Sequence, residues 1–171
     1  MAKMLLKEAG KSPASFFSLI KNPLKFRLYL LKSLPAAYFA GLKLKQLDED
    51  HSIVVVPYKW FTKNPFRSTY FACLAMAGEL STGILAMGHI HKTQVRVSML
   101  ILSIEGKFMK KATGDTMFIC NQGNEIKQNI SMAISTGEPK TFKACSSGYN
   151  SNGELIAEFN CEWSFMVKKT P

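Results

Sequence analysis

The chain has few residues of the kinds that bind metals or form cross-links. Four cysteines are present, namely Cys73, Cys120, Cys145 and Cys161. They are far apart and form no Cys-x-x-Cys pair, so the sequence indicates neither a zinc site nor a disulfide framework. Of the three histidines, His89 and His91 would share one face of a strand, a weak metal site without a nearby carboxylate. We therefore expect reduced thiols, a cytoplasmic location, no metal and no cofactor.

Acidic residues are almost absent from the first part of the chain. Residues 1–47 hold nine Lys or Arg and one acidic residue, whereas the remainder holds 13 basic and 11 acidic residues. The net charge of +10 therefore belongs mainly to an N-terminal arm. A nucleic-acid-binding protein would carry a basic face with stacking aromatics on its folded body, so we expect no nucleic-acid partner.

Secretion signals, repeats and low-complexity segments are also lacking. The apolar run at residues 15–20 is too short for the core of a signal peptide, so secretion is not expected. The length of 171 residues suits one domain with a good core. We divide the chain into a basic N-terminal helical arm, residues 1–33, and a folded domain, residues 34–171.

Residues 68–88 form a long apolar segment, STYFACLAMAGELSTGILAMG, with one formal charge, at Glu79. A carboxylate among buried neighbours costs several kcal/mol unless it is paired, hydrogen-bonded or protonated, so Glu79 has either a partner or a chemical role. The segment is long enough to span a bilayer, but a charge at mid-depth would cost roughly 3 kcal/mol. A helix buried on all sides within a soluble domain is favoured.

The rest of the pattern predicts mainly strands. Strands are expected at residues 41–46, 52–60, 94–104, 115–120, 140–149 and 154–167. Residues 125–135 have modest helical character or form a long connection. The segment Asn150-Ser151-Asn152-Gly153 is a strong hairpin signal, and apolar residues alternate cleanly along the last strand. An antiparallel sheet that curls around the apolar helix would bury the whole circumference of that helix. The predicted class is therefore α+β.

A helix is also expected at residues 14–34, interrupted where Asn22 caps a new helix with Pro23 at its first position. Leu24, Leu28 and Leu31 belong to its apolar stripe, and lysines lie on its other faces. One interpretation is a helix packed on the domain with a solvated basic side. The other is a surface helix that meets anionic lipid or acidic ligand groups, which makes the arm a candidate for peripheral membrane contact.

The predicted architecture resembles the hotdog fold, an antiparallel curved sheet wrapped around one long central helix. Residues 64–83 resemble the PaaI-type branch of hotdog acyl-CoA thioesterases, and in particular a poorly characterised hotdog family beside it. In that branch a polar residue precedes the helix, a His-Gly-Gly element opens it and an acid follows. Asn64 and Glu79 match this spacing. Tyr70-Phe71-Ala72 stands in place of His-Gly-Gly, and Gly83 stands where a hydroxyl residue is often found.

The resemblance implies hydrolysis of an acyl-CoA or another acyl thioester in lipid metabolism. The catalytic residues would be Glu79, as general base or nucleophile, and Asn64, which would hold the carbonyl or the attacking water. The backbone N–H of Phe71 would stabilise the oxyanion. Further substrate contacts would come from residues on both sides of the helix start, namely Tyr70, Ala72, Ser81, Thr82, Arg67 and Lys63.

The helix spacing adds a requirement of its own. Residues 71 and 79 of one helix are separated by about 12 Å of rise, so one small carbonyl cannot contact both. A working site would need Phe71 of one subunit and Glu79 of another. We therefore expect a homodimer or a dimer of dimers, which agrees with the resemblance.

Each assignment has a structural alternative. Glu79 would be a structural carboxylate, bonded to Ser81, Thr82, Asn64 or a buried water, or paired with a Lys across an interface. Asn64 would be an ordinary turn or cap residue, and Lys63 and Arg67 would be solvated charges rather than ligands of coenzyme A phosphates. For the whole protein, the alternative to a thioesterase is a non-catalytic hotdog module that binds acyl chains or lipid.

Overall fold

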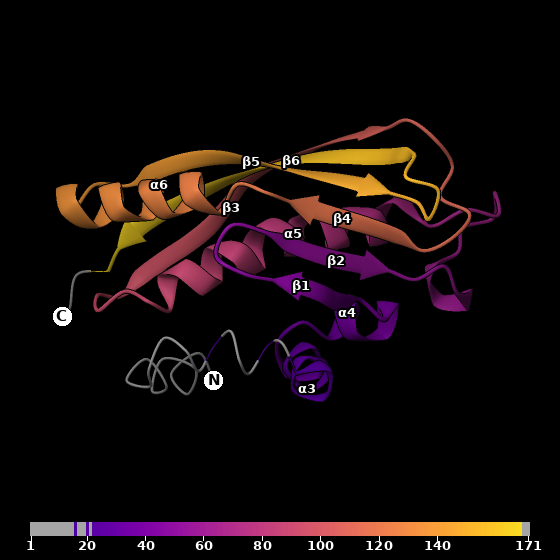
Figure 1. Ribbon diagram of the computed structural model, residues 1–171, viewed down its shortest axis with the longest axis horizontal. Coiled ribbons are helices and arrows are strands. Elements are labelled where there is room, and N and C mark those ends of the chain that lie inside the picture. Colours follow the sequence, from indigo (N-terminus) through magenta and orange to yellow (C-terminus); the bar gives the residue numbers. More distant parts are fainter. Residues whose placement is uncertain (1–15, 17–19, 21, 169–171) are drawn as a thin grey trace.

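The computed structural model describes residues 16, 20 and 22–168 of the chain. Its elements follow in the order α3 (Pro23–Ser33), α4 (Pro35–Ala40), β1 (Lys43–Leu47), β2 (Ser52–Val56), η1 (Trp60–Thr62), α5 (Phe71–Ile90), β3 (Val97–Phe108), β4 (Thr116–Cys120), α6 (Gly123–Thr136), β5 (Lys140–Tyr149) and β6 (Leu155–Val167). The strands form one antiparallel sheet in the order β1-β2-β4-β5-β6-β3. Figure 1 shows this curved sheet with α5 running along it and with α3 and α4 beyond β1. The predicted α+β class is confirmed.

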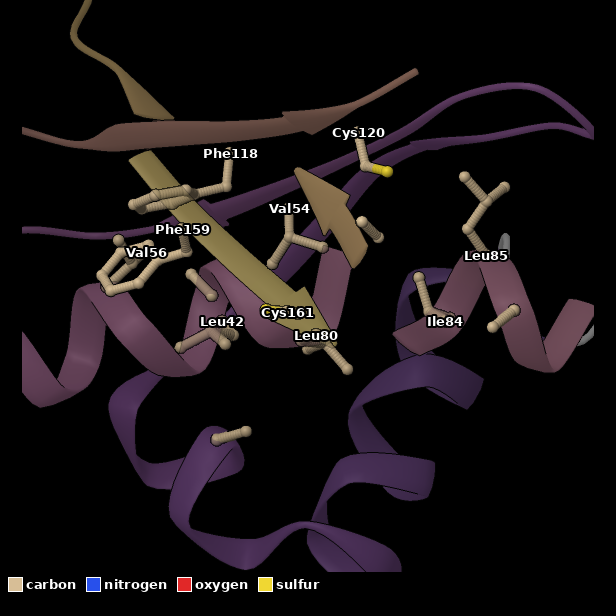
Figure 2. Packing of buried hydrophobic residues seen from close by; sticks show 14 of the residues in the cluster. Leu42, Val54, Val56, Leu80, Ile84, Leu85, Phe118, Cys120, Phe159 and Cys161 are labelled. Atoms are coloured by element: carbon tan, nitrogen blue, oxygen red, sulfur yellow. The ribbon is translucent and has the colours of Figure 1, made fainter. Parts of the chain in front are cut away.

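Close packing between α5 and the sheet depends on small residues. A Cβ atom added at Gly78 would lie 2.7 Å from Cδ2 of Phe159, so no other residue type fits there without movement. Leu80, Ile84 and Leu85 of α5 are buried in the core that the sheet covers. Figure 2 shows these side chains beside core residues of β2, β4 and β6. The alternation in the last strand is confirmed, because its apolar residues face this core.

The expectation that α5 is buried on its whole circumference is wrong. Ala72, Ala75, Met76, Glu79, Met87 and Ile90 are only partly buried. Their spacing places them on one side of the helix, because residues three, four and seven apart share a face. A single sheet covers the opposite side of α5. We call this half-open set of six residues the α5 strip.

The two edges of the sheet differ in character. The β1 edge is five residues long and carries the exposed lysines Lys43 and Lys45, which discourage pairing with another strand. The β3 edge is twelve residues long, and its exposed side chains include Leu100, Leu102 and Ile104. A long, apolar edge strand is a surface on which another chain can add.

The N-terminal helix α3 begins as predicted. The side chain of Asn22 accepts hydrogen bonds from the N–H groups of Leu24 and Lys25, and Pro23 is the first helical residue. Phe26 and Leu30 enter the core, however, whereas the predicted stripe of Leu24, Leu28 and Leu31 faces solvent. The part of the predicted helix before residue 22 falls almost wholly outside the described residues. The boundary between arm and domain at residues 33 and 34 stays a prediction.

Within the described part of the chain, α5 is the one helix long and apolar enough to cross a membrane. Sixty-seven per cent of its apolar window is buried inside the fold, as is usual for the core helix of a soluble protein. Of the two alternatives for residues 125–135, the structure has the helix, α6, and Asn150–Gly153 forms the predicted turn between β5 and β6.

Candidate active site

The loop before α5 is held in shape by Asn64. Its Oδ1 accepts hydrogen bonds from the N–H groups of Phe66 (3.0 Å) and Ser68 (3.2 Å), and its Nδ2 donates to Oγ of Ser68 (3.0 Å). Arg67 adopts a left-handed φ of 59°, which closes the turn. Oδ1 and Nδ2 of Asn64 thus both form hydrogen bonds within the loop, as the structural alternative of a turn residue predicts.

The first turn of α5 leaves amide donors free. Tyr70 is the cap residue and provides no side-chain hydrogen bond, while its carbonyl accepts from the N–H groups of Cys73 and Leu74. Within the described residues, the N–H groups of Phe71 and Ala72 donate to no protein atom. These amides and the positive end of the helix dipole favour a negatively charged or carbonyl oxygen at this point.

A cleft of about 440 Å³ opens at this helix start. It lies between the loop before α5 and the connection from β3 to β4, and it is lined by Asn64, Pro65, Phe66, Ser68, Thr69, Tyr70, Phe71, Leu74, Phe108, Met109, Lys110, Lys111 and Ala112. Phe71 stands edge-on to both Tyr70 and Phe108, with ring centroids 4.8 and 6.5 Å apart. Because the lining is mostly apolar with two lysines, the cleft suits an apolar ligand that carries a negative charge.

Glu79 lies on the α5 strip, two helical turns further on. Its side chain is half-buried, and its carboxylate accepts no hydrogen bond and forms no ion pair within the described residues. Burial raises the pKa of Glu79 above that of an ordinary carboxyl. The carboxylate also contributes to a raised pKa of Tyr29 in α3, after the larger effect of burial of the phenol. The side chains of Ser81, Thr82 and Asn64 therefore do not bond the carboxylate of Glu79, and a Lys from another subunit as its partner stays a prediction.

One protomer does not bring Glu79 and the helix start together. Glu79 does not line the cleft, and eight residues of α5 separate it from Phe71, which is about 12 Å along the axis. The α5 strip connects the two positions along the surface of the helix. Within one chain, a single small carbonyl group therefore cannot contact both the amide of Phe71 and the carboxylate of Glu79.

The two hydroxyl residues assigned to the site point into the fold. Oγ of Ser81 donates to the carbonyl of Gly78 and lies 2.7 Å from Oγ of Ser146. Oγ1 of Thr82 donates to the carbonyl of Glu79 and accepts from Nε1 of Trp163 at 2.9 Å. Both side chains are fully buried, so these contacts join α5 to the sheet.

The structure brings some predicted residues to the cleft and leaves others outside it. Tyr70, Phe71 and Asn64 line it, whereas Lys63, Arg67 and Ala72 do not. Sequence reasoning missed Lys110 and Lys111 in the cleft wall. The adjacent lysines were visible in the sequence, but their position depends on a backbone hydrogen bond of 2.7 Å from Thr69 to Ala112, which ties the β3–β4 connection to the start of α5.

The prediction that His89 and His91 share a strand face is wrong, because they lie at the C-terminal end of α5. Nε2 of His89 is 2.8 Å from the carbonyl of Glu49, and the ring of His91 stacks on Phe16. Among the residues that the structure describes, no group of three or more His, Cys, Asp or Glu side chains has an arrangement able to hold a metal ion.

Known structures resemble this fold over most of the chain. A protein of unknown function from Pseudomonas aeruginosa, described as a probable thioesterase, is 19% identical and superposes with a TM-score of 0.70; the match covers 85% of this chain and 97% of that one. A thioesterase from Haemophilus influenzae is 13% identical, with a TM-score of 0.59 and coverage of 82% and 88%. A protein of unknown function from Chlorobaculum tepidum is 14% identical, with a TM-score of 0.72 and coverage of 85% and 97%.

No family model matches the sequence, and no curated protein matches it. The structural likeness nevertheless defines the architecture: the chain has the hotdog fold, with a curved antiparallel sheet and a long central helix. Similarity at these identities establishes the fold and leaves the reaction to be argued from the site itself.

Proposed function

We propose that this protein is an acyl-thioester hydrolase of the PaaI-type branch of hotdog proteins and that it acts on acyl-CoA as a homodimer. The observation that carries the proposal is Glu79, a half-buried carboxylate without a partner among the described residues, on the open side of α5. An unpaired carboxylate in an apolar setting destabilises a fold, and groups with raised pKa values cluster at functional sites.

In the proposed reaction, the thioester carbonyl oxygen lies at the helix start of one subunit and accepts a hydrogen bond from the N–H of Phe71. Glu79 of the other subunit removes a proton from water, and the resulting hydroxide attacks the carbonyl carbon. The tetrahedral oxyanion collapses, the C–S bond breaks, and the thiolate takes the proton back from Glu79. A carboxylic acid and a thiol are released. In the nucleophilic variant, Glu79 attacks directly and water then cleaves the mixed anhydride.

Exposed side chains beside the α5 strip are evidence that a second copy of the chain supplies the other half of the proposed site. Ile104 and Phe108 of β3 pair with inward-facing residues of β6, yet they are 45% and 52% exposed. Ile104 and Phe108 of β3 and the half-open α5 strip are thus partly exposed to solvent among the described residues, and β3 has one unpaired edge. A two-fold axis at this edge would bring two copies of α5 toward each other.

The lysines of the cleft are evidence that the carrier of the acyl group is negatively charged. Lys111 forms no ion pair in the described part of the chain, and Lys110 pairs only with the exposed Glu154. Coenzyme A is rich in phosphate, which lysine side chains bind as point charges. The apolar walls around Phe71 and Phe108 would hold the part of the substrate nearest the thioester.

A panel of acyl-CoA substrates of increasing chain length, assayed by release of free thiol, tests the proposal. Wild-type protein is expected to hydrolyse at least one member, and Glu79→Gln is expected to lose most of that activity. Glu125→Gln is the matched control, because Glu125 is exposed on α6, away from the cleft. Absence of turnover with every substrate would refute the enzyme assignment, and full activity of Glu79→Gln would refute the role of Glu79.

The second candidate, a non-catalytic module that binds acyl chains, is favoured by one feature. Tyr70 and Phe71 place aromatic rings at the cleft, where glycines would let a thioester approach the helix backbone. Under this alternative, fatty acyl-CoA binds more tightly as the chain lengthens, and no thiol is released. Binding measured by calorimetry beside the thiol assay separates the two functions.

A further inference from the structure

A basic surface with protruding apolar side chains lies on the side of the molecule formed by α3, α4 and η1. In α3, the side chains of Leu24, Leu28 and Leu31 are 70%, 58% and 45% exposed. At 100° per residue they point away from Phe26 and Leu30, which enter the core. The helix therefore has two apolar sides, of which the described residues cover only one.

The same kind of side chain continues on the neighbouring elements. Trp60 of η1 is 84% exposed, and its ring centroid lies 6.5 Å from that of Phe61, which is 6.3 Å from Phe39 of α4. α4 packs against both α3 and η1, so these residues belong to one side of the molecule. In Figure 1 α3 and α4 lie together beyond β1. We call the exposed side chains of α3, α4 and η1 the aromatic–leucine surface.

Charge on this surface is mainly positive, although the exposed carboxylate of Asp115 accepts a hydrogen bond from the N–H of Tyr58, two residues before Trp60. Between residues 9 and 78, acidic residues occur only in the Asp48-Glu49-Asp50 turn. That turn pairs with Lys92 and Lys127, which lie outside the surface. Lys25, Lys32 and Lys59 are exposed beside the apolar side chains and form no ion pair in the described part of the chain.

From these observations we propose that the aromatic–leucine surface docks on an anionic lipid bilayer. Exposed Trp, Phe and Leu side chains with several unpaired lysines beside them are typical of a peripheral membrane surface. The side chains of Trp60, Phe61 and Phe39 line none of the described clefts. They form an exposed cluster of three rings that lines no groove, a geometry that suits insertion among lipid headgroups better than a complementary protein pocket.

This surface is separate from the one that the proposed dimer uses. It flanks β1, whereas the uncovered edge at β3 is at the opposite end of the strand order. Dimerisation through β3 would therefore leave the surface open, and membrane docking would not require the hydrolase reaction.

Co-sedimentation of the full chain with vesicles tests the proposal. We expect binding to vesicles of phosphatidylcholine mixed with phosphatidylglycerol, weak binding to phosphatidylcholine alone, and release at high salt. The double variant Lys25→Gln/Lys32→Gln should bind about 30-fold more weakly, because each basic side chain near an anionic surface contributes about fivefold. Lys127→Gln/Lys140→Gln, which removes the same charge from elsewhere, should bind like the wild type.

A second pair of variants tests how much the apolar side chains contribute to vesicle binding. Leu24→Ser/Leu28→Ser is expected to lose roughly tenfold or more in vesicle affinity, because two apolar side chains no longer leave water. Met132→Ser, at an exposed position of α6, should change nothing. All substituted positions are exposed except the half-buried Lys140, and retention of the thermal transition confirms that the variants fold.

Fluorescence gives an independent readout, because the chain has two tryptophans, and Trp163 is only 4% exposed. Trp60 should shift its emission to shorter wavelength and lose iodide quenching when anionic vesicles are added. The proposal is overturned if the wild type does not bind these vesicles, or if the surface variants bind as the wild type does. Binding to a purified acidic acyl carrier protein instead, with the same variants impaired, would assign the surface to a protein partner.

Discussion

A mixture of two inactive variants tests whether the proposed site combines Phe71 of one subunit with Glu79 of the other. Glu79→Gln removes the base and keeps the helix amide. Phe71→Pro removes the amide and keeps the base. Proline is tolerated here because Phe71 is the first residue of α5, where the N–H has no helical acceptor, and because Tyr70 has the extended backbone that a residue before proline prefers.

The expected magnitudes follow from the geometry. Loss of one oxyanion donor lowers kcat by roughly 100- to 1000-fold, so each variant alone should be nearly inactive. After equal amounts are unfolded together and refolded, about half of the dimers contain one subunit of each kind. Each mixed dimer has one intact site and one doubly defective site, so the mixture should recover about a quarter of the wild-type activity.

Phe71→Ala is the control for loss of the aromatic ring, because it keeps the N–H and is expected to retain much more activity than Phe71→Pro. The measurement is thiol release from the best acyl-CoA substrate before and after mixing. If the mixture stays at the level of the separate variants, the composite site is refuted. If Phe71→Pro alone is fully active, the helix amide is not the oxyanion donor.

Three further outcomes are expected. Because burial raises the pKa of Glu79, the contribution of Glu79 to stability is present below its unfolded-state pKa and is lost as pH rises through its folded-state pKa. In urea unfolding, the wild type should therefore lose stability relative to Glu79→Gln as pH rises across that interval. The kcat/KM of the wild type should rise across the same interval, because the base must be deprotonated to act. Ile104→Lys should yield a monomer in sedimentation velocity, whereas Met132→Lys, at equal 45% exposure, should leave the oligomer intact. Gly78→Ala should lose about 1–3 kcal/mol in chemical denaturation through its clash with Phe159, whereas Gly114→Ala, with no atom within 4 Å, should be neutral.

Local signals in the sequence predicted most elements of the fold. The cap at Asn22-Pro23, the hairpin at residues 150–153 and the alternation of the last strand depend on neighbouring residues, so they can be read along the chain. The central helix was recognised by its length and small residues. Its open strip was not, because exposure depends on where the sheet stops.

The N-terminal helix shows why an apolar stripe does not identify its own partner. Leu24, Leu28 and Leu31 have the spacing of a buried face, yet Phe26 and Leu30 are the residues that pack inward. Both sets have helical periodicity, and the choice between them depends on the position of α4 and β1. The orientation of α3 is thus a tertiary result with a functional consequence, the exposed leucine surface.

The sequence by itself determined that a solitary carboxylate lies in an apolar helix, and that Phe71 and Glu79 are too far apart to act within one chain, because helix rise is fixed. Only the tertiary structure decided what surrounds them. It used Asn64, Ser81 and Thr82 for internal hydrogen bonds, placed Lys110 and Lys111 at the cleft, and left Glu79 without a partner among the described residues on an open strip. These features depend on contacts between distant segments, which no local pattern encodes.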